Sequence, residues 1–388
     1  MIHGKQCTII WYVDDLKILH IEKKVVEQII ADLNKVFGQE SPLMTTNGKV
    51  LEYLGMTLYY TSKGKVKISM HEYTDKMLAE LPSDMNGLSR TPAELHLFNT
   101  DKGAEKLPEE KGQLFHHLVA KLLYLCWRTQ QDIQTAMAFL CTRVQAPNVD
   151  DYKKLAKVMQ YLCGMRHLTL TIEPDGDNNL NWWVDSSYDV HPDMRSLSGI
   201  IMTLGKGATY TSSTKEKINT KSSMEAELVA IDYSMAQVLW TRHFLTSQGL
   251  CVMTTTIYQD NKSTILLAEN GKTSSNRRTK HLDGRYFFMT DKIKKGEVKE
   301  AFCPMHNMLA DLFTKPLQGR IFIHMRDKIL NLPAIENHRH SQECVGNQEK
   351  IEKMDGSKRN RSDPMMSHWK PMTMTEVGPA HHALAHNF

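Results

Sequence analysis

Four acidic residues lie at the ends of predicted strands or within predicted helices. These residues are Asp185, Glu227, Asp260 and Asp311. Asp185 closes the run NWWV and Asp260 closes TTTIYQ, while Glu227 and Asp311 lie in segments with a helical pattern. One edge of a sheet can gather all four. Because crowded carboxylates repel one another and raise each other's pKa, such a cluster indicates divalent cations, and oxygen ligands favour Mg²⁺ or Mn²⁺ over zinc.

Two such ions about 3.5 to 4 Å apart activate a water molecule and stabilise the leaving oxygen during in-line attack on a phosphodiester. The four acidic residues are therefore typical of a metal-dependent nuclease. A second interpretation is that Asp185 and Asp260 cap helices or turns and that Glu227 is a solvated helix residue. Spacing alone leaves both interpretations open.

A further acidic feature is the pair Asp14 and Asp15, between the runs TIIWYV and LKIL. This pattern predicts a β-hairpin with both carboxylates at its tip. Like charges side by side repel, so the pair needs an explanation, although an ordinary hairpin turn is an alternative.

The elements in the first part of the chain follow from hydrophobic periodicity. Residues 21–38 predict an amphipathic helix, and residues 49–70 predict two strands joined by a turn at 62–65. A stretch rich in Pro, Gly, Asn and Asp, 83–108, predicts a linker. Three amphipathic helices within 109–165 follow it.

From Leu168 the pattern changes to short strands and then to an alternation of strands and helices. Four strands are predicted before Lys215, and a long helix begins near Ser223. A strand, two helices, a strand and a last helix, NMLADLFTK, complete the segment. This order indicates a mixed sheet flanked by helices. The predicted fold class of the whole chain is a multi-domain combination of α+β and α/β.

The composition sets further expectations. With 388 residues, 41% hydrophobic and 24% charged, the chain is ordinary for a globular protein of about two or three domains. Its net charge of +4 says little about partners. The seven scattered cysteines show no zinc spacing, which favours a reducing compartment. No run predicts a signal peptide or a membrane span.

Five stretches between Asn181 and Gly319 follow one another in unbroken order: WWVDSSYDVHPDMRSLSG, GKGATYTSSTKEKINTKSSMEAELVAIDYS, YQDNKSTILLAENG, RRTKHLDGRYFFMTDKI and NMLADLFTKPLQG. Together they resemble the ribonuclease H domain of copia-type LTR retrotransposon polyproteins. The resemblance implies a ribonuclease H-like mixed sheet and hydrolysis of the RNA strand of RNA–DNA hybrids with two Mg²⁺ or Mn²⁺ ions. The family's acidic positions fall on Asp185, Glu227, Asp260 and Asp311.

Other residues of this region are candidates for supporting roles. Glu225 precedes Glu227 by two positions on a helix, so we expect it to point to the opposite side. His306 could ferry protons as a loop histidine, or it is a plain surface histidine. A basic stretch with interleaved aromatics predicts contacts with nucleic-acid phosphates, unless it is a solvated helix surface. Its predicted contact residues are Arg277, Arg278, Lys280 and Arg285.

The hairpin YVDD resembles the palm hairpin of reverse transcriptases, and the copia-type match continues through LEYLGMTLYY and KISMHEYTDKML to MQYLCGMRHLTLTI. The resemblance implies that Asp14 and Asp15 are metal ligands, neutralised by a metal ion and by the Mg²⁺ of a nucleoside triphosphate. In the family a third palm carboxylate and the fingers lie upstream, and only thirteen residues precede Asp14. We therefore expect no polymerase activity, unless the reading frame extends upstream.

These inferences predict four parts of the chain. They are a truncated reverse transcriptase palm and thumb at 1–95, a helical connector at 96–167, a ribonuclease H-like domain at 168–320, and a C-terminal extension at 321–388. The extension is expected to be mostly disordered after about residue 337. The expected partners are RNA–DNA hybrids and the rest of the polyprotein, without a membrane, in the cytoplasm and, during integration, in the nucleus. The alternative is an inactive, decayed remnant or a passive nucleic-acid-binding module.

Overall fold

The computed structural model describes residues 1–39, 41–177, 179–270, 283–333 and 373–378. The chain divides into two compact units. The smaller comprises Met1–Gly48 and the residues from Leu332 onward, and the larger comprises Lys49–Asn331. The predicted domain boundaries near 95, 167 and 320 lie inside the larger unit and stay predictions. Among the described residues, no helix has the length and apolar character needed to cross a bilayer.

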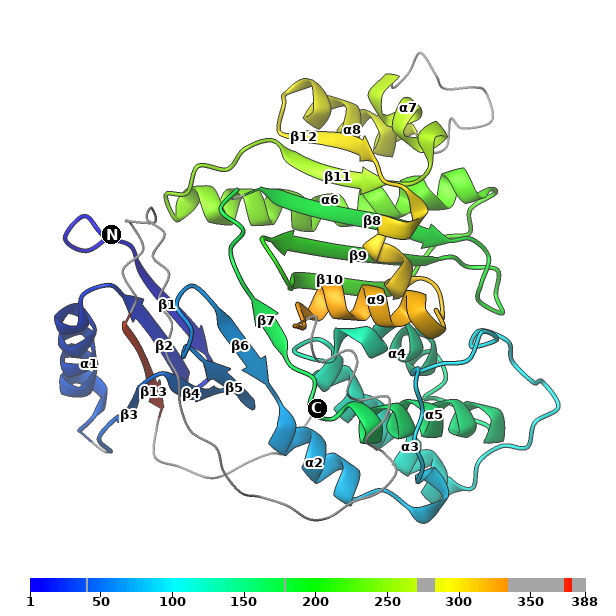
Figure 1. The fold of residues 1–388 in the computed structure, drawn as a ribbon, viewed down its shortest axis with the longest axis horizontal. Helices are drawn as coiled ribbons and strands as arrows, with labels where there is room; N and C mark the ends of the chain where they lie inside the picture. Colours follow the sequence, from blue (N-terminus) through cyan, green and yellow to red (C-terminus); the bar gives the residue numbers. More distant parts are fainter. Residues whose placement is uncertain (40, 178, 271–282, 334–372, 379–388) are drawn as a thin grey trace, which may run out of the picture. The chain divides into compact units, whose positions relative to one another are not determined.

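The smaller unit is an antiparallel sheet with one helix. Its elements are β1 (Cys7–Tyr12), β2 (Asp15–His20), α1 (Lys23–Phe37), β3 (Met44–Asn47) and β13 (Thr373–Gly378). The strand order is β1-β2-β13-β3 (Figure 1). Ile18 of β2 and Val26 of α1 are fully buried against each other. The predicted hairpin and the predicted amphipathic helix are confirmed.

Most of the tail that the sequence predicts to be disordered lies outside the described residues. Within it, β13 pairs antiparallel with β2, with Thr375 in register with Ile18, and with β3 on its other side. The stretch TMTEVG is only six residues long. A six-residue alternation of apolar and polar side chains inside a polar tail is too short to indicate a strand from the sequence.

The larger unit begins with an antiparallel sheet in the order β4-β5-β6-β7. Its strands are β4 (Val50–Tyr53), β5 (Met56–Tyr59), β6 (Val66–Ser69) and β7 (Leu170–Ile172), and α2 (His71–Ala79) follows β6. The sequence predicts two strands within 49–70, but the structure has three. The chain reverses at Leu54 and Gly55, whose φ angles are 49° and 72°. Two left-handed residues suit a tight hairpin turn, but leucine rarely adopts that conformation, so the pattern does not reveal this turn.

Three helices predicted from apolar stripes are confirmed: α3 (Glu109–Cys126), α4 (Gln134–Cys141) and α5 (Val149–Met165). Phe115 of α3, Phe139 of α4 and Leu162 of α5 have no exposed surface. α5 begins with a capping box, because the side chains of Asn148 and Asp151 each accept a hydrogen bond from the other's backbone N–H.

The second sheet of the larger unit is the predicted mixed sheet. Its strands are β8 (Leu180–Ser187), β9 (Leu197–Leu204), β10 (Ala208–Lys215), β11 (Thr255–Gln259) and β12 (Val298–Phe302). Their order is β10-β9-β8-β11-β12 (Figure 1), with β8, β9 and β10 antiparallel and β11 parallel to both β8 and β12. β7, which the pattern groups with these strands, pairs with β6 instead. The accompanying helices are α6 (Ser223–Ser247), α7 (Lys262–Asn270), α8 (Asp283–Lys294), η5 (Met305–Asn307), η6 (Leu309–Phe313) and α9 (Gly319–Leu330).

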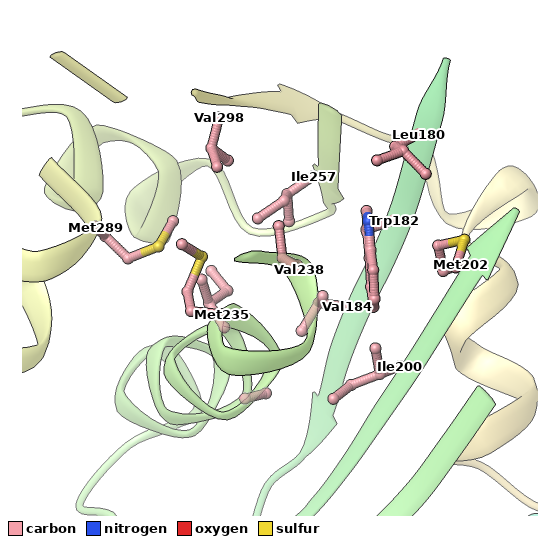
Figure 2. Close-up of a cluster of buried hydrophobic side chains, with 12 residues drawn as sticks. Leu180, Trp182, Val184, Ile200, Met202, Met235, Val238, Ile257, Met289 and Val298 are labelled. Carbon is pink, nitrogen blue, oxygen red and sulfur yellow. The ribbon is translucent and has the colours of Figure 1, made fainter. Parts of the chain in front are cut away.

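One face of the mixed sheet packs against α6. Trp182 and Val184 of β8 lie on this face together with Val238 of α6, and all three are fully buried (Figure 2). Burying a side chain of this size contributes about 1.5 to 3 kcal/mol, so these contacts anchor β8 to α6. Because side chains alternate along a strand, Trp183 and Asp185 point to the other side of the sheet.

The segment NMLADLFTK, predicted as the last helix, forms the short 3₁₀ helix η6 instead of an α-helix. Its hydrogen bonds span three residues, as between the N–H of Asp311 and the carbonyl oxygen of Met308 at 3.1 Å. Pro304 and Pro316 bound the segment. Proline disfavours the α conformation in the residue before it, so Pro316 limits how far a helix can extend at its C-terminal end.

Candidate active site

Asp185 of β8 is the most enclosed of the predicted ligands, with 1% of it exposed. The hydroxyl of Thr314 donates a hydrogen bond to its Oδ2, and Lys315 Nζ lies 3.4 Å from the same oxygen. Both partners directly follow η6, which approaches the sheet at Gly199, the residue opposite Asp185 on β9. A Cβ at Gly199 would lie 2.6 Å from Thr314 Cγ2. The absent side chain of Gly199 therefore lets η6 reach Asp185.

Glu227 and Asp260 bring two further carboxylates to Asp185. One oxygen of each of these three residues lies within 4.8 Å of the other two. Glu227 stands near the start of α6, and its Oε2 accepts a hydrogen bond from Gln259 Nε2 at 3.1 Å. Asp260 directly follows β11. The ends of two parallel strands and the beginning of α6 thus meet at one edge of the sheet.

Glu225 has a different role from Glu227. Its Oε2 accepts a hydrogen bond from the Lys221 N–H at 2.8 Å, and its own N–H donates to Ser222 Oγ at 3.3 Å. These bonds satisfy N–H groups at the start of α6. Ser222 is therefore the N-cap of α6, and the Glu225 carboxylate binds the backbone just before the helix, in agreement with the expectation that it does not belong to the acidic group.

Asp311 of η6 is buried, but it is not part of the three-residue group found among the described residues. Lys315 Nζ lies 2.6 Å from Asp311 Oδ1 and 3.4 Å from Asp185 Oδ2. The sequence predicts that all four carboxylates gather at one place. The structure brings three of them within reach of one cation and links the fourth to Asp185 through the Lys315 ammonium group.

Burial and mutual repulsion raise the pKa of three carboxyl groups at this site. Burial, together with the charges of Asp185 and Asp260, raises the pKa of Glu227 well above its ordinary value. Burial and the charge of Asp185 raise the pKa of Asp260, and they raise that of Asp311 to about 6 although Lys315 opposes this. Burial lowers the pKa of Lys315, but the neighbouring carboxylates raise it by more. One lysine does not offset the negative charge of the site.

The donor set fits a hard divalent cation. Its donors are carboxylate oxygens, three of which converge on one place, and Mg²⁺ and Mn²⁺ prefer oxygen ligands. A bound cation would offset the repulsion that raises the carboxyl pKa values.

Stabilisation by Mg²⁺ should therefore depend on pH. Raised carboxyl pKa values favour the folded state at low pH, and this contribution is lost as pH rises through the folded-state pKa, which is about 6 for Asp311. Deprotonated carboxylates are also the better ligands. We expect Mg²⁺ to raise the thermal unfolding midpoint much more at about pH 8 than at about pH 5. Calorimetry measures both midpoints, and an equal Mg²⁺ effect at the two pH values would contradict the assignment.

Among the described residues, none of the other predicted site residues belongs to this three-carboxylate group. Asp14 lies in the turn of the β1–β2 hairpin and Asp15 begins β2, both exposed and both in the smaller unit. His306 is exposed in η5, and Arg285 lies in α8. The roles of these residues stay predictions. Three predicted contacts with nucleic acid fall outside the described residues: Arg277, Arg278 and Lys280.

Sequence reasoning missed three residues that shape the site: Gly199, Thr314 and Lys315. All three stand inside the stretches SLSG and LFTKP that carry the resemblance. Lys315 follows Asp311 by four positions, a spacing typical of ion pairs along a helical turn, and this was the available signal. The contact between Gly199 and Thr314 joins distant parts of the sequence, so no local pattern reveals it.

No protein-family model matches the chain. The chain is similar to retrotransposon Pol polyproteins of plants and yeast. It is 26% identical over 311 residues to the retrovirus-related Pol polyprotein from transposon TNT 1-94 of Nicotiana tabacum, covering 78% of this chain and 23% of that protein. For the polyprotein from transposon RE2 of Arabidopsis thaliana the identity is 25% over 324 residues, covering 82% and 21%. For the Ty1-DR5 Gag-Pol polyprotein of Saccharomyces cerevisiae it is 22% over 342 residues, covering 84% and 19%.

These similarities confirm the resemblance predicted from the motifs. The chain spans about a fifth of the length of these three relatives.

Solved structures resemble smaller parts of the chain. LC11-RNase H1, isolated from compost by a metagenomic approach, is 15% identical and covers 35% of this chain and 92% of its own, with a TM-score of 0.27. The prototype foamy virus protease-reverse transcriptase is 13% identical and covers 37% of this chain and 21% of its own, with a TM-score of 0.28. Likenesses at these TM-scores do not establish a common fold.

Proposed function

We propose that the chain is part of a retrotransposon Pol polyprotein and that its larger unit hydrolyses the RNA strand of RNA–DNA hybrids. The observation that carries this proposal is the convergence of Asp185, Glu227 and Asp260, with one oxygen of each within 4.8 Å of the others. The similarity of the chain to Pol polyproteins supports the choice of substrate. The expected partners are RNA–DNA hybrids and the other parts of such a polyprotein.

Four residues would hold two Mg²⁺ or Mn²⁺ ions: Asp185, Glu227, Asp260 and Asp311. When bound, such ions activate water for in-line attack and neutralise the charge that develops on the phosphodiester. The hydroxyl of Thr314 orients Asp185, and the amide of Gln259 orients Glu227. Hydrogen bonds of this kind hold ligand carboxylates in position before substrate arrives.

Two further roles belong to this proposal. His306, exposed ahead of η6, would carry a proton between bulk water and the site. The basic stretch around α8 would contact phosphates of the hybrid, which predicts binding that weakens with salt.

The proposal is tested with the full chain and a hybrid labelled on either strand. We expect Mg²⁺-dependent fragments from the RNA strand, no fragments from the DNA strand, and no cleavage in EDTA. A DNA duplex of the same sequence is the control, and we expect it to stay intact. A hybrid that is bound but left intact with both Mg²⁺ and Mn²⁺ would contradict the proposal and favour the passive nucleic-acid-binding module.

A further inference from the structure

A pocket with no part in the proposed hydrolysis lies on the side of the mixed sheet opposite α6. Its volume is about 310 Å³, and its lining includes Trp183, Tyr258, Phe302, Asn307 and Lys328. Ligand pockets range from about 300 to 1,000 Å³, so this pocket suits a single ring system better than a long ligand.

The pocket adjoins the acidic group. Trp183 precedes Asp185 by two positions, and Tyr258 precedes Asp260 by two positions. Because residues two apart on a strand point to the same face, the Trp183 ring and the Asp185 carboxylate follow one another along the same side of β8, and Asp260 directly follows β11, the strand that carries Tyr258. Cys303 also lines the pocket, and the charge of Asp260 adds to burial in raising the pKa of its thiol.

The lining suits a flat ring next to phosphate groups. The rings of Trp183 and Tyr258 stack with centroids 5.0 Å apart and an interplanar angle of 22°, and Phe302 is 47% exposed. Nucleobases stack on aromatic side chains of this kind. Lys262 Nζ lies 4.6 Å from the centroid of the Phe302 ring, and Lys328 lies in the lining. These two lysines place positive charge beside the aromatic rings, as binding of a phosphate backbone requires.

We propose that this pocket binds an unpaired nucleobase of the nucleic acid held at the acidic group. The choice of nucleic acid as the ligand rests on the proposed function. A base inside a duplex cannot enter such a pocket, so the base is either flipped out or belongs to a single-stranded extension. The chain should therefore prefer a hybrid that carries unpaired nucleotides beside its duplex.

Binding in EDTA tests this inference without any cleavage. We expect the full chain to bind a fluorescent hybrid with a short RNA overhang about 5- to 100-fold more tightly than a blunt hybrid. Phe302→Ala should remove most of this preference, as measured by fluorescence anisotropy. Phe244 of α6 is a matched control because it is 42% exposed and stacks on Trp240 outside the pocket. Phe244→Ala should keep the preference; equal affinity for the two hybrids, or an equal loss in both variants, would overturn the proposal.

Photocross-linking adds a test that does not depend on a variant. 5-Iodouracil in the overhang should form adducts with Trp183, Tyr258 or Phe302, identified by peptide mass spectrometry. Adducts at other residues alone would overturn the inference. If the chain prefers the overhang but does not cleave the hybrid in Mg²⁺, base binding in the pocket is supported and the proposed hydrolysis is refuted. If it cleaves the hybrid without preferring the overhang, the hydrolysis is supported and base binding in the pocket is refuted.

Discussion

Asp185→Asn is expected to lower Mg²⁺-dependent cleavage of an RNA–DNA hybrid by about a thousandfold or more. Asp185 contacts the Thr314 hydroxyl and the Lys315 ammonium group, and one of its oxygens lies within 4.8 Å of oxygens of Glu227 and Asp260. Asparagine keeps the size of the side chain and an oxygen that accepts the Thr314 hydrogen bond. It removes the charge that a divalent cation needs. Single-turnover cleavage of a labelled hybrid measures the effect.

A matched control for this variant lies four residues further along the chain. Asp189 is exposed and has a φ of 54°, which asparagine tolerates well, so Asp189→Asn should cleave as the unchanged chain does. In EDTA, Asp185→Asn should unfold at a midpoint no lower than that of the unchanged chain, because it relieves repulsion with Glu227 and Asp260. Wild-type cleavage by Asp185→Asn would show that its charge has no part in hydrolysis.

Gly199→Ala is expected to destabilise the larger unit by about 1 to 3 kcal/mol and to lower cleavage by about a hundredfold. The added Cβ would lie 2.6 Å from Thr314 Cγ2, 2.9 Å from the carbonyl oxygen of Ala310 and 2.9 Å from Phe313 Cβ. Two of these neighbours are close to the backbone and cannot rotate away, so η6 must move from the sheet. That movement would take Thr314 away from Asp185.

The same substitution in α3 provides the control for this second prediction. A Cβ at Gly112 meets nothing within 4 Å, and alanine is favoured over glycine in a helix by about 1 kcal/mol. Gly112→Ala should therefore keep cleavage and should match or exceed the stability of the unchanged chain in urea unfolding. If Gly199→Ala has normal stability and activity, the close packing of η6 on β9 is wrong.

Much of the fold could be predicted from local periodicity. α1 and α5 each carry a helical apolar pattern, and Asp185 lies near the end of β8 while Asp260 directly follows β11. Parallel strands place their ends at one edge, so the approach of Asp185 and Asp260 was open to prediction. The turn at Leu54 could not be predicted, because leucine rarely adopts the left-handed conformation that this residue has.

The rest of the site depends on contacts between distant segments. Spacing shows that Asp311 belongs to a helical turn, but not that Lys315 connects it to Asp185. The aromatic pocket likewise depends on how β8, β11 and the segment after β12 come together. Patterns along the chain report which face a side chain occupies, whereas its neighbours depend on packing between elements.

The position of Lys315 has a consequence for metal affinity. Its ammonium group already neutralises part of the charge on Asp185 and Asp311, so a divalent ion binding between these two carboxylates, as proposed, would have to displace this ammonium group. The affinity for the ion would then reflect the difference between the carboxylates' interaction with the ion and their interaction with the Lys315 ammonium group. Lys315→Met should accordingly bind the ion there more tightly, although the same carboxylates would repel each other more strongly while no ion is bound.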